Sequence, residues 1–223
     1  MLPFDRRLAA LPPESFLRDY IGAGCAVRCG ANWRFGAGAR GTPELLAAVG
    51  REHGARVCVA APVAYDGAPV SSTRIRAAVR EGRLADAEAM LGRPHFVRET
   101  VVHGREVARA HGFPTANFTP ASDLLPPVGV YAVETVVDGH RLAGVGSIGF
   151  RPTFPGARPD RPVLEVHLLD FRGDLYGRAL DIAFLARLRD ERAFPNAETL
   201  FAQIARDADA AKSVFERRPR DGR

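Results

Sequence analysis

Apolar residues are spaced differently before and after about residue 94. In the first part they recur at helical spacing in residues 12–20 and 43–49, while residues 56–61 form one continuous apolar run that fits a buried strand. A weaker strand candidate begins at Ala26. Helix and strand alternating in this way predict an α/β unit with parallel strands.

A further helix is predicted from the segment Val70-Ser-Ser-Thr-Arg-Ile-Arg76 to about Leu91. Ser71 or Ser72 would cap its N-terminus. The free N–H groups there, together with hydroxyls and nearby arginines, are able to bind an anion. An ordinary capped helix with solvated arginines explains the same residues equally well.

Short apolar runs with glycine and proline turns replace the helical pattern from Pro94 onwards. Asp138-Gly139 between two such runs is typical of a tight hairpin. Short strands of this kind predict a small antiparallel barrel. The expected strands cover residues 95–102, 129–137, 142–148, 163–170 and 180–185.

The strand at 163–170 alternates over its central part, with Leu164, Val166 and Leu168 on one face and Glu165 and His167 on the other. A strand with one dry and one wet face explains this pattern. Alternatively, Glu165 faces a cleft and acts as a general base on an alcohol that is being phosphorylated.

The clearest helix of the chain is predicted at residues 196–215, with Asn196 as its cap and an apolar stripe that includes Leu200, Ile204 and Phe215. We expect it to pack against the barrel. Residues 217–223 are predicted to be a disordered tail.

Composition narrows the class of protein. The 223 residues are 46% hydrophobic, enough for a real core, and no stretch reaches the roughly 20 apolar residues that span a bilayer. No apolar segment of a secretory signal follows the N-terminal charges, which predicts a cytoplasmic protein without membrane contact. Thirty of the 31 basic residues are arginine, so we read the net charge of +5 as codon bias and do not expect nucleic-acid binding.

Lysine and cysteine are both scarce. Lys212 is the one lysine and follows no glycine loop, which excludes a P-loop, so phosphate must be held by arginine, backbone N–H groups or a metal. Cys25, Cys29 and Cys58 form no CxxC pair, and we expect small buried thiols in a reducing compartment.

The segment from His103 to Asn117 is too rich in turn-forming residues for a helix. In an extended chain the Thr115 hydroxyl and the Asn117 amide would point the same way. Beside a glycine loop with arginines, these neutral oxygens are suited to a metal–phosphate unit. A polar loop that bonds its own backbone is the competing interpretation, and the residues alone favour it.

The segment 70–76, preceded by Trp33-Arg-Phe-Gly36, resembles the FMN adenylyltransferase domain of bacterial bifunctional riboflavin kinase/FAD synthetases. The resemblance implies a partial Rossmann-like nucleotidyltransferase domain. It also implies that the motif residues contact ATP phosphates; these are Ser71, Ser72, Thr73 and Arg76.

The same family carries a Gly-x-Phe-Asp-Gly-x-His-x-Gly-His type motif that this sequence lacks, since His53 is its first histidine. Asn32 also stands where the family usually has Asp. Those histidines stabilise the phosphates during transfer. We therefore expect FMN adenylyltransferase activity to be lost or weak.

The remainder of the chain resembles the riboflavin kinases of this family. Six segments occur in the family's order: Gly112-Phe-Pro-Thr-Ala-Asn117, Gly129-Val-Tyr131, Gly149-Phe-Arg-Pro-Thr-Phe154, Glu165-Val-His167, Leu175-Tyr-Gly177 and Leu188-Arg-Asp-Glu191. The resemblance implies a six-stranded Greek-key barrel that transfers the γ-phosphoryl group of ATP to the ribityl 5′-hydroxyl of riboflavin, giving FMN.

The resemblance also assigns roles to residues. Glu165 would be the catalytic base, and Thr115 and Asn117 would hold Mg²⁺. The nucleotide and its phosphates would contact Gly104, Arg109, Gly112, Pro114, Thr115 and Asn117, and the flavin would contact Arg151, Thr153 and Arg189.

We therefore expect three parts: a partial adenylyltransferase-like domain at 1–93, a riboflavin kinase domain at 94–216 and the tail. The expected partners are the small molecules riboflavin and ATP, and the sequence indicates no oligomeric state. Two alternatives remain open. One is a full bifunctional enzyme whose N-terminal half is missing from this sequence, and the other is a non-catalytic flavin- or nucleotide-binding module.

Overall fold

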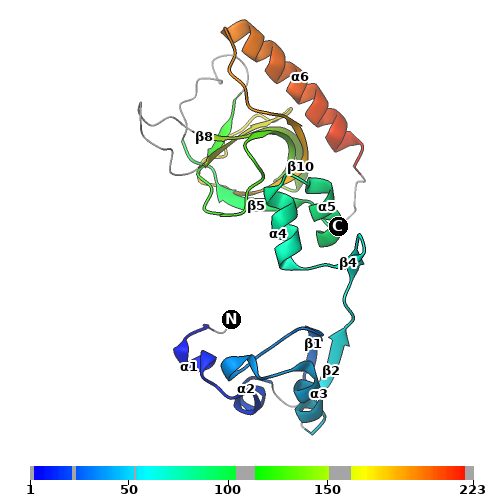
Figure 1. Ribbon diagram of the computed structural model, residues 1–223. Helices are drawn as coiled ribbons and strands as arrows, with labels where there is room; N and C mark the ends of the chain where they lie inside the picture. The colour runs from blue at the N-terminus through cyan, green and yellow to red at the C-terminus, as the bar shows by residue number, and fades with distance from the viewer. Residues whose placement is uncertain (1–2, 22–23, 53, 104–113, 151–161, 219–223) are drawn as a thin grey trace, which may run out of the picture. The chain divides into compact units, whose positions relative to one another are not determined.

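The computed structural model describes residues 3–21, 24–52, 54–103, 114–150 and 162–218. The chain divides into two compact units, Met1–Val70 and Ser71–Arg223 (Figure 1). Compactness thus assigns the two helices after Val70 to the barrel, whereas we expected them to belong to the first domain. The domain boundary at residue 93 stays a prediction, because family membership and compactness are different criteria.

The first unit is a small α/β layer, as the alternating pattern predicts. Strands β1 (Ala26–Gly30) and β2 (Arg56–Ala60) pair in parallel, with Ala26 opposite Arg56. Leu17, Phe35 and Leu46 form the core between the sheet and the helices. The other elements are α1 (Arg6–Ala9), α2 (Pro13–Tyr20), the 3-10 turn η1 (Ala37–Ala39), α3 (Pro43–Glu52) and the hairpin β3 (Ala64–Tyr65) with β4 (Ala68–Pro69).

The three cysteines lie in or beside this sheet. All are free thiols, and Cys25 and Cys29 are half-buried. Cys58 is exposed, so the expectation of a buried thiol is wrong there. It lies on the face of β2 opposite Val57, which packs on the core.

The single helix expected up to Leu91 is two helices, α4 (Ser72–Arg80) and α5 (Leu84–Leu91). Gly82 lies between them with a φ of 75°, a left-handed conformation that ends α4. The turn folds α5 back onto α4, and Ala78, Val79 and Ala87 are buried together.

The second unit is built on a curled, antiparallel six-stranded sheet in the order β5-β10-β7-β8-β9-β6 (Figure 1). A single bridge joins Val102, just beyond β5, to Asn117 on β6, so the two edges of the sheet meet. This is the expected barrel. Its strands are β5 (His95–Thr100), β6 (Ala116–Phe118), β7 (Gly129–Val137), β8 (His140–Phe150), β9 (Pro162–Leu168) and β10 (Ala179–Arg189).

Alternation along the strands separates the barrel's inside from its outside. Leu164, Val166 and Leu168 of β9 are buried in the core with Tyr131 and Phe184, as the pattern predicted. The hairpin between β7 and β8 turns at Asp138 and Gly139, whose φ angles of 50° and 81° fit a type I′ turn.

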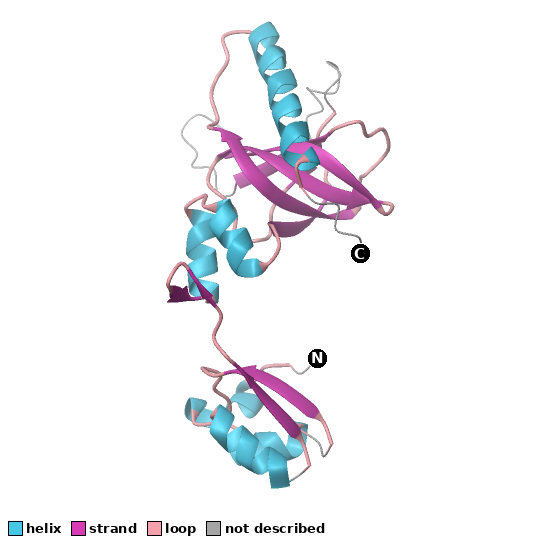
Figure 2. Ribbon diagram, turned by 90° about the vertical axis from the view of Figure 1, so that its right-hand side faces the viewer, coloured by secondary structure: helices cyan, strands magenta, loops and turns pink. Residues whose placement is uncertain are grey.

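Helix α6 (Ala197–Glu216) lies along the outer surface of β7, β8 and β10 (Figure 2). Its N-cap is Asn196, whose Oδ1 accepts the Thr199 N–H at 2.9 Å, as expected. Ala211 packs there against Ala132 and Leu185. The helix is followed by Arg218, which is ion-paired with Glu88 of α5, so this part of the expected tail is anchored.

Within the described residues, no helix is long and apolar enough to cross a membrane.

Candidate functional site

A row of directly opposed residues crosses the outer face of the barrel. Asn117 on β6 faces Glu165 on β9, and Glu165 faces Ser147 on β8. Ser147 in turn faces Val130 on β7, which faces Arg189 on β10. Directly opposed side chains of antiparallel strands have Cβ atoms about 4.5–5.5 Å apart. The fold therefore brings the expected base Glu165 beside the expected metal ligand Asn117.

The short strand β6 positions Asn117. Its carbonyl oxygen accepts the Val102 N–H at 2.8 Å, and its Nδ2 donates to the Thr115 carbonyl at 3.4 Å. Asn117 is 5% exposed. Because Nδ2 is directed at the Thr115 carbonyl, the amide oxygen is turned away from that carbonyl.

Two further contacts hold β6, and sequence reasoning missed both. The His167 Nδ1 lies 2.8 Å from the Pro114 carbonyl, just before β6. Beyond it, the buried Glu99 carboxylate accepts the N–H groups of Ala121 and Ser122 at 3.1–3.2 Å. His167 was visible as a polar residue on the wet face of its strand, but its partner is 53 residues away in sequence.

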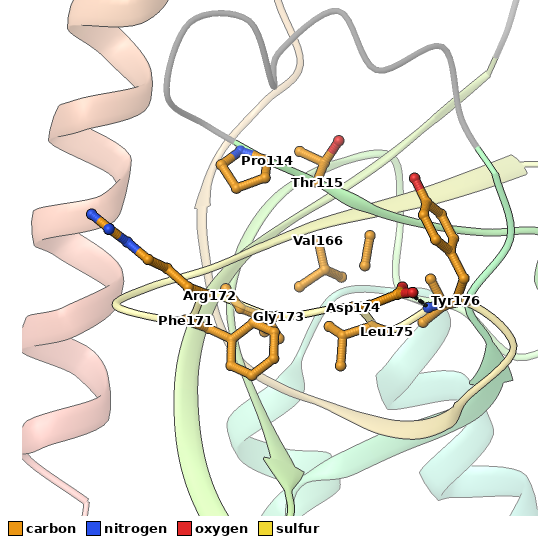
Figure 3. A pocket seen from close by; sticks show the side chains of 12 residues that line it. Pro114, Thr115, Val166, Phe171, Arg172, Gly173, Asp174, Leu175 and Tyr176 are labelled. Atoms are coloured by element: carbon orange, nitrogen blue, oxygen red, sulfur yellow. Dashed lines mark hydrogen bonds between the residues drawn. The ribbon is translucent and has the colours of Figure 1, made fainter.

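A cavity of about 550 Å³ opens beside Thr115 (Figure 3). Its apolar wall includes Val166, Leu168 and Phe171, and Tyr176 lies at its other side. Tyr176 stacks on His103 with ring centroids 3.8 Å apart. Figure 3 shows the Thr115 hydroxyl directed away from the apolar side chains of Val166 and Leu175. Glu165 and Asn117 do not line this cavity, so the pocket and the row are adjoining but distinct surfaces.

Arg189 is held in an ion pair that the sequence did not reveal. Its Nε and Nη2 donate to the Asp207 carboxylate of α6 at 2.8–3.1 Å, and its Nη1 donates to the Asp190 carbonyl at 2.9 Å. Gln203 also donates to Asp207, at 2.8 Å. The Asp207 side chain is 6% exposed. All three guanidinium nitrogens of Arg189 thus make contacts within the protein.

The motif at the start of α4 forms a capped helix terminus. The Ser71 Oγ accepts the Arg74 N–H at 3.3 Å, which confirms the predicted cap. Ser72, Thr73 and Arg76 are exposed. Of the other expected site residues, Gly104, Arg109, Gly112, Arg151 and Thr153 lie outside the described residues.

The donors in the row suit a magnesium–phosphate unit better than a metal cage. In the described part of the chain, no group of three or more His, Cys, Asp or Glu side chains is arranged to hold a metal ion. Mg²⁺ keeps several waters and relies on one or two protein oxygens plus substrate phosphates. Asn117, directly opposite Glu165 in the register of β6 and β9, and Thr115, two residues before it, offer neutral oxygens of the kind that this mode uses.

Comparisons with known proteins agree with this architecture. The riboflavin kinase family model matches residues 91–215, which contain the barrel and nearly all of α6. The FAD synthetase model matches residues 1–74. The barrel is therefore a riboflavin kinase domain, preceded by a segment of the FAD synthetase type.

Similarity extends along nearly the whole chain. The bifunctional riboflavin kinase/FMN adenylyltransferase of Escherichia coli K12 is 41% identical over 216 residues, covering 95% of this chain and 68% of that one. The protein of the same name from Bacillus subtilis 168 is 34% identical over 219 residues, covering 96% and 69%. The chain belongs to the family of bifunctional riboflavin kinase/FMN adenylyltransferases.

A solved structure is similar as well. A Streptococcus pneumoniae protein described as a macrolide-efflux protein shares 31% identity, with a TM-score of 0.77. The match covers 95% of this chain and 68% of that one.

Proposed function

We propose that this chain transfers the γ-phosphoryl group of Mg²⁺-bound ATP to the 5′-hydroxyl of riboflavin, giving FMN. The observation that carries the proposal is the register that sets Asn117, Glu165 and Ser147 side by side on one face of the barrel. A carboxylate next to neutral oxygen donors is the arrangement that an alcohol acceptor and a metal-bound phosphate both need.

Glu165 acts as the general base in this proposal. It accepts the proton of the ribityl hydroxyl while that oxygen attacks the γ-phosphorus. Asn117 and Thr115 hold Mg²⁺, which neutralises charge on the phosphates when it is bound. Phosphoryl transfer depends mainly on positioning and charge neutralisation, so few protein groups need to take part in covalent chemistry.

The nucleoside part of ATP is proposed to enter the cavity beside Thr115. The apolar wall and the Tyr176 ring suit a flat base, and Thr115, which lines the cavity, precedes Asn117 of the row by two residues. Such an orientation directs the phosphates toward Asn117. Riboflavin then approaches Glu165 along the outer face, from the side of β8.

Incubation with riboflavin, ATP and Mg²⁺, followed by separation of the flavins, tests the proposal. We expect FMN to form, with one ADP for each FMN. Flavin binding without FMN would instead identify a binding module. FAD in the product would show that the chain is bifunctional, as the names of its relatives suggest.

A further inference from the structure

Gly149 on β8 makes room for the carboxylate of Glu191. If Gly149 carried a Cβ atom, the Oε1 of Glu191 would lie 2.6 Å from it and Oε2 3.1 Å. These separations are too short for a side chain at position 149 while Glu191 stays in place. The backbone of Gly149 is not in the left-handed region, so its conformation does not require glycine. A side chain there would oblige the Glu191 carboxylate, the far end of an exposed and flexible side chain, to move away.

The Glu191 carboxylate therefore lies on the same face as the row. Gly149 follows Ser147 by two residues in one strand. A Cβ atom at position 149 would therefore point outward, to the same face as the Ser147 side chain. Gly149 is opposite Val163, and Ser147 is opposite Glu165. Gly149 is thus the diagonal cross-strand neighbour of Glu165. The Cα atoms of such neighbours are about 7–8 Å apart, and their Cβ positions are somewhat closer. Two carboxylates border this part of the face, with Ser147 beside them.

The backbone that carries Glu191 is fixed from both sides. The Asp190 carbonyl accepts from Arg189, and the Asp190 carboxylate pairs with Arg187 at 2.7 Å. On the other side, the guanidinium groups of Arg189 and Arg192 lie 5.6 and 5.0 Å from the Phe194 ring. The ion pair to the buried Asp207 anchors Arg189. Glu191 is therefore presented by a braced segment, although its own side chain is exposed.

We propose that Glu191 is a second carboxylate of the acceptor site, and that it binds the secondary hydroxyls of the acceptor's polyol chain. The inference rests on the proposed function and adds a specificity-determining residue to it. An ionised carboxylate accepts several hydrogen bonds and donates none, which suits a chain of neighbouring hydroxyl donors. Glu165 would take the proton of the terminal hydroxyl, and Glu191 would hold the hydroxyls that precede it.

Two substitutions, at different residues, should each weaken the proposed contact between Glu191 and the polyol chain. Glu191→Gln replaces the carboxylate by an amide, which is a weaker hydrogen-bond acceptor. Gly149→Ala places a methyl group where the Glu191 carboxylate lies. Each should raise the KM for riboflavin roughly 10-fold or more, the range for a hydrogen bond to a charged group, and leave the KM for ATP unchanged. The double variant should be little worse than either single one, because both remove the same interaction. Glu198→Gln, at an exposed position in the first turn of α6, is the matched control.

Binding of lumiflavin, which has the flavin ring but no polyol chain, separates this role from a general disturbance of the site. Flavin fluorescence should show weaker riboflavin binding by the Glu191→Gln variant and unchanged lumiflavin binding. Equal loss for both ligands, or an unchanged riboflavin KM in that variant, would overturn the inference. A wild-type chain that forms no FMN would refute the proposed kinase function instead, so the two failures are distinguishable.

Discussion

Glu165 lies between Asn117 and Ser147, with no apolar side chain directly opposite it on either neighbouring strand. Its side chain is half-buried, and it follows the buried Leu164 and precedes the buried Val166. Leu164 and Val166 hold the strand in the barrel core, while Glu165 stays on the outer face. A change at Glu165 should therefore affect chemistry more than folding.

We predict that Glu165→Gln lowers kcat for FMN formation by about 10²-fold or more, because the amide cannot accept the hydroxyl proton. The amide is nearly isosteric, so the unfolding midpoint and riboflavin binding should be retained. Steady-state kinetics and a flavin titration measure the two effects. A kcat near that of the wild type would remove Glu165 from the mechanism.

His95 at the start of β5 gives the barrel a pH dependence. Burial is the main cause that lowers the pKa of its imidazole from 6.5, and the nearby Arg93 lowers it further. The Leu124 carbonyl, 3.1 Å from Nε2, acts in the other direction and raises the pKa. As the pH falls below 6.5, the unfolded chain takes up a proton that the folded protein resists. The free energy of unfolding therefore falls as the pH drops below 6.5. Above pH 6.5, His95 does not contribute to such a change.

We predict that His95→Gln flattens the fall in unfolding free energy between pH 6.5 and about 5, as measured by urea unfolding at several pH values. His140→Gln, an exposed position after the β7–β8 turn, is the control and should leave the slope unchanged. Parallel curves for the wild type and His95→Gln would contradict the prediction.

Among the elements, α6 depends on one ion pair, formed by its buried Asp207, as well as on its apolar stripe. Arg189 at the end of β10 and Asp207 near the middle of α6 form a bidentate ion pair. Beside it, Arg192 donates a hydrogen bond of 2.5 Å to Gln203. The apolar spacing predicted where the helix lies. It did not predict this pair, because its residues are separated by 18 positions and look like ordinary surface charges in the sequence.

We predict that Asp207→Ala lowers the free energy of unfolding by about 3 kcal/mol, because it leaves the Arg189 guanidinium, whose side chain is 19% exposed, without its counter-ion. Asp209→Ala, two residues further along the same helix and exposed, should have little effect. Far-UV circular dichroism is the appropriate probe, since the single tryptophan, Trp33, lies in the first unit. Equal losses for the two variants would show that the ion pair does not anchor α6.

Considered as a whole, the chain combines a riboflavin kinase barrel with a segment of the FAD synthetase type. The 223 residues include no His-x-x-His or His-x-Gly-His sequence. By the resemblance, Ser72, Thr73 and Arg76 are expected to contact ATP phosphates together with a histidine-bearing motif, and the 223 residues contain no such motif. We propose that this chain does not support adenylyl transfer at a useful rate.

We predict that incubation of this chain with FMN, ATP and Mg²⁺ yields no FAD under conditions in which riboflavin is converted to FMN. The Escherichia coli relative serves as the positive control for the assay, since it is named for both activities. Chromatographic separation of the flavins measures the outcome. FAD formation by the purified chain would show that the missing motif is dispensable.

The sequence by itself determined the order and type of most elements, because their signals are local. Period-two alternation placed Glu165 and His167 on the outer face of β9, Asp138-Gly139 marked the hairpin, and Asn196 marked the start of α6. The resemblance of short motifs then indicated the family. Where a local signal was ambiguous, as at Gly82, the prediction of one continuous helix was wrong.

Only the tertiary structure decided which polar residues meet. Strand register set Asn117, Glu165 and Ser147 in one row, and folding brought His167 to Pro114, Asp207 to Arg189 and Glu191 to Gly149. Such contacts join residues that are distant in the chain, and they depend on how the sheet curls and where α6 packs. No local pattern of residues encodes that geometry, because it results from the burial of the whole core.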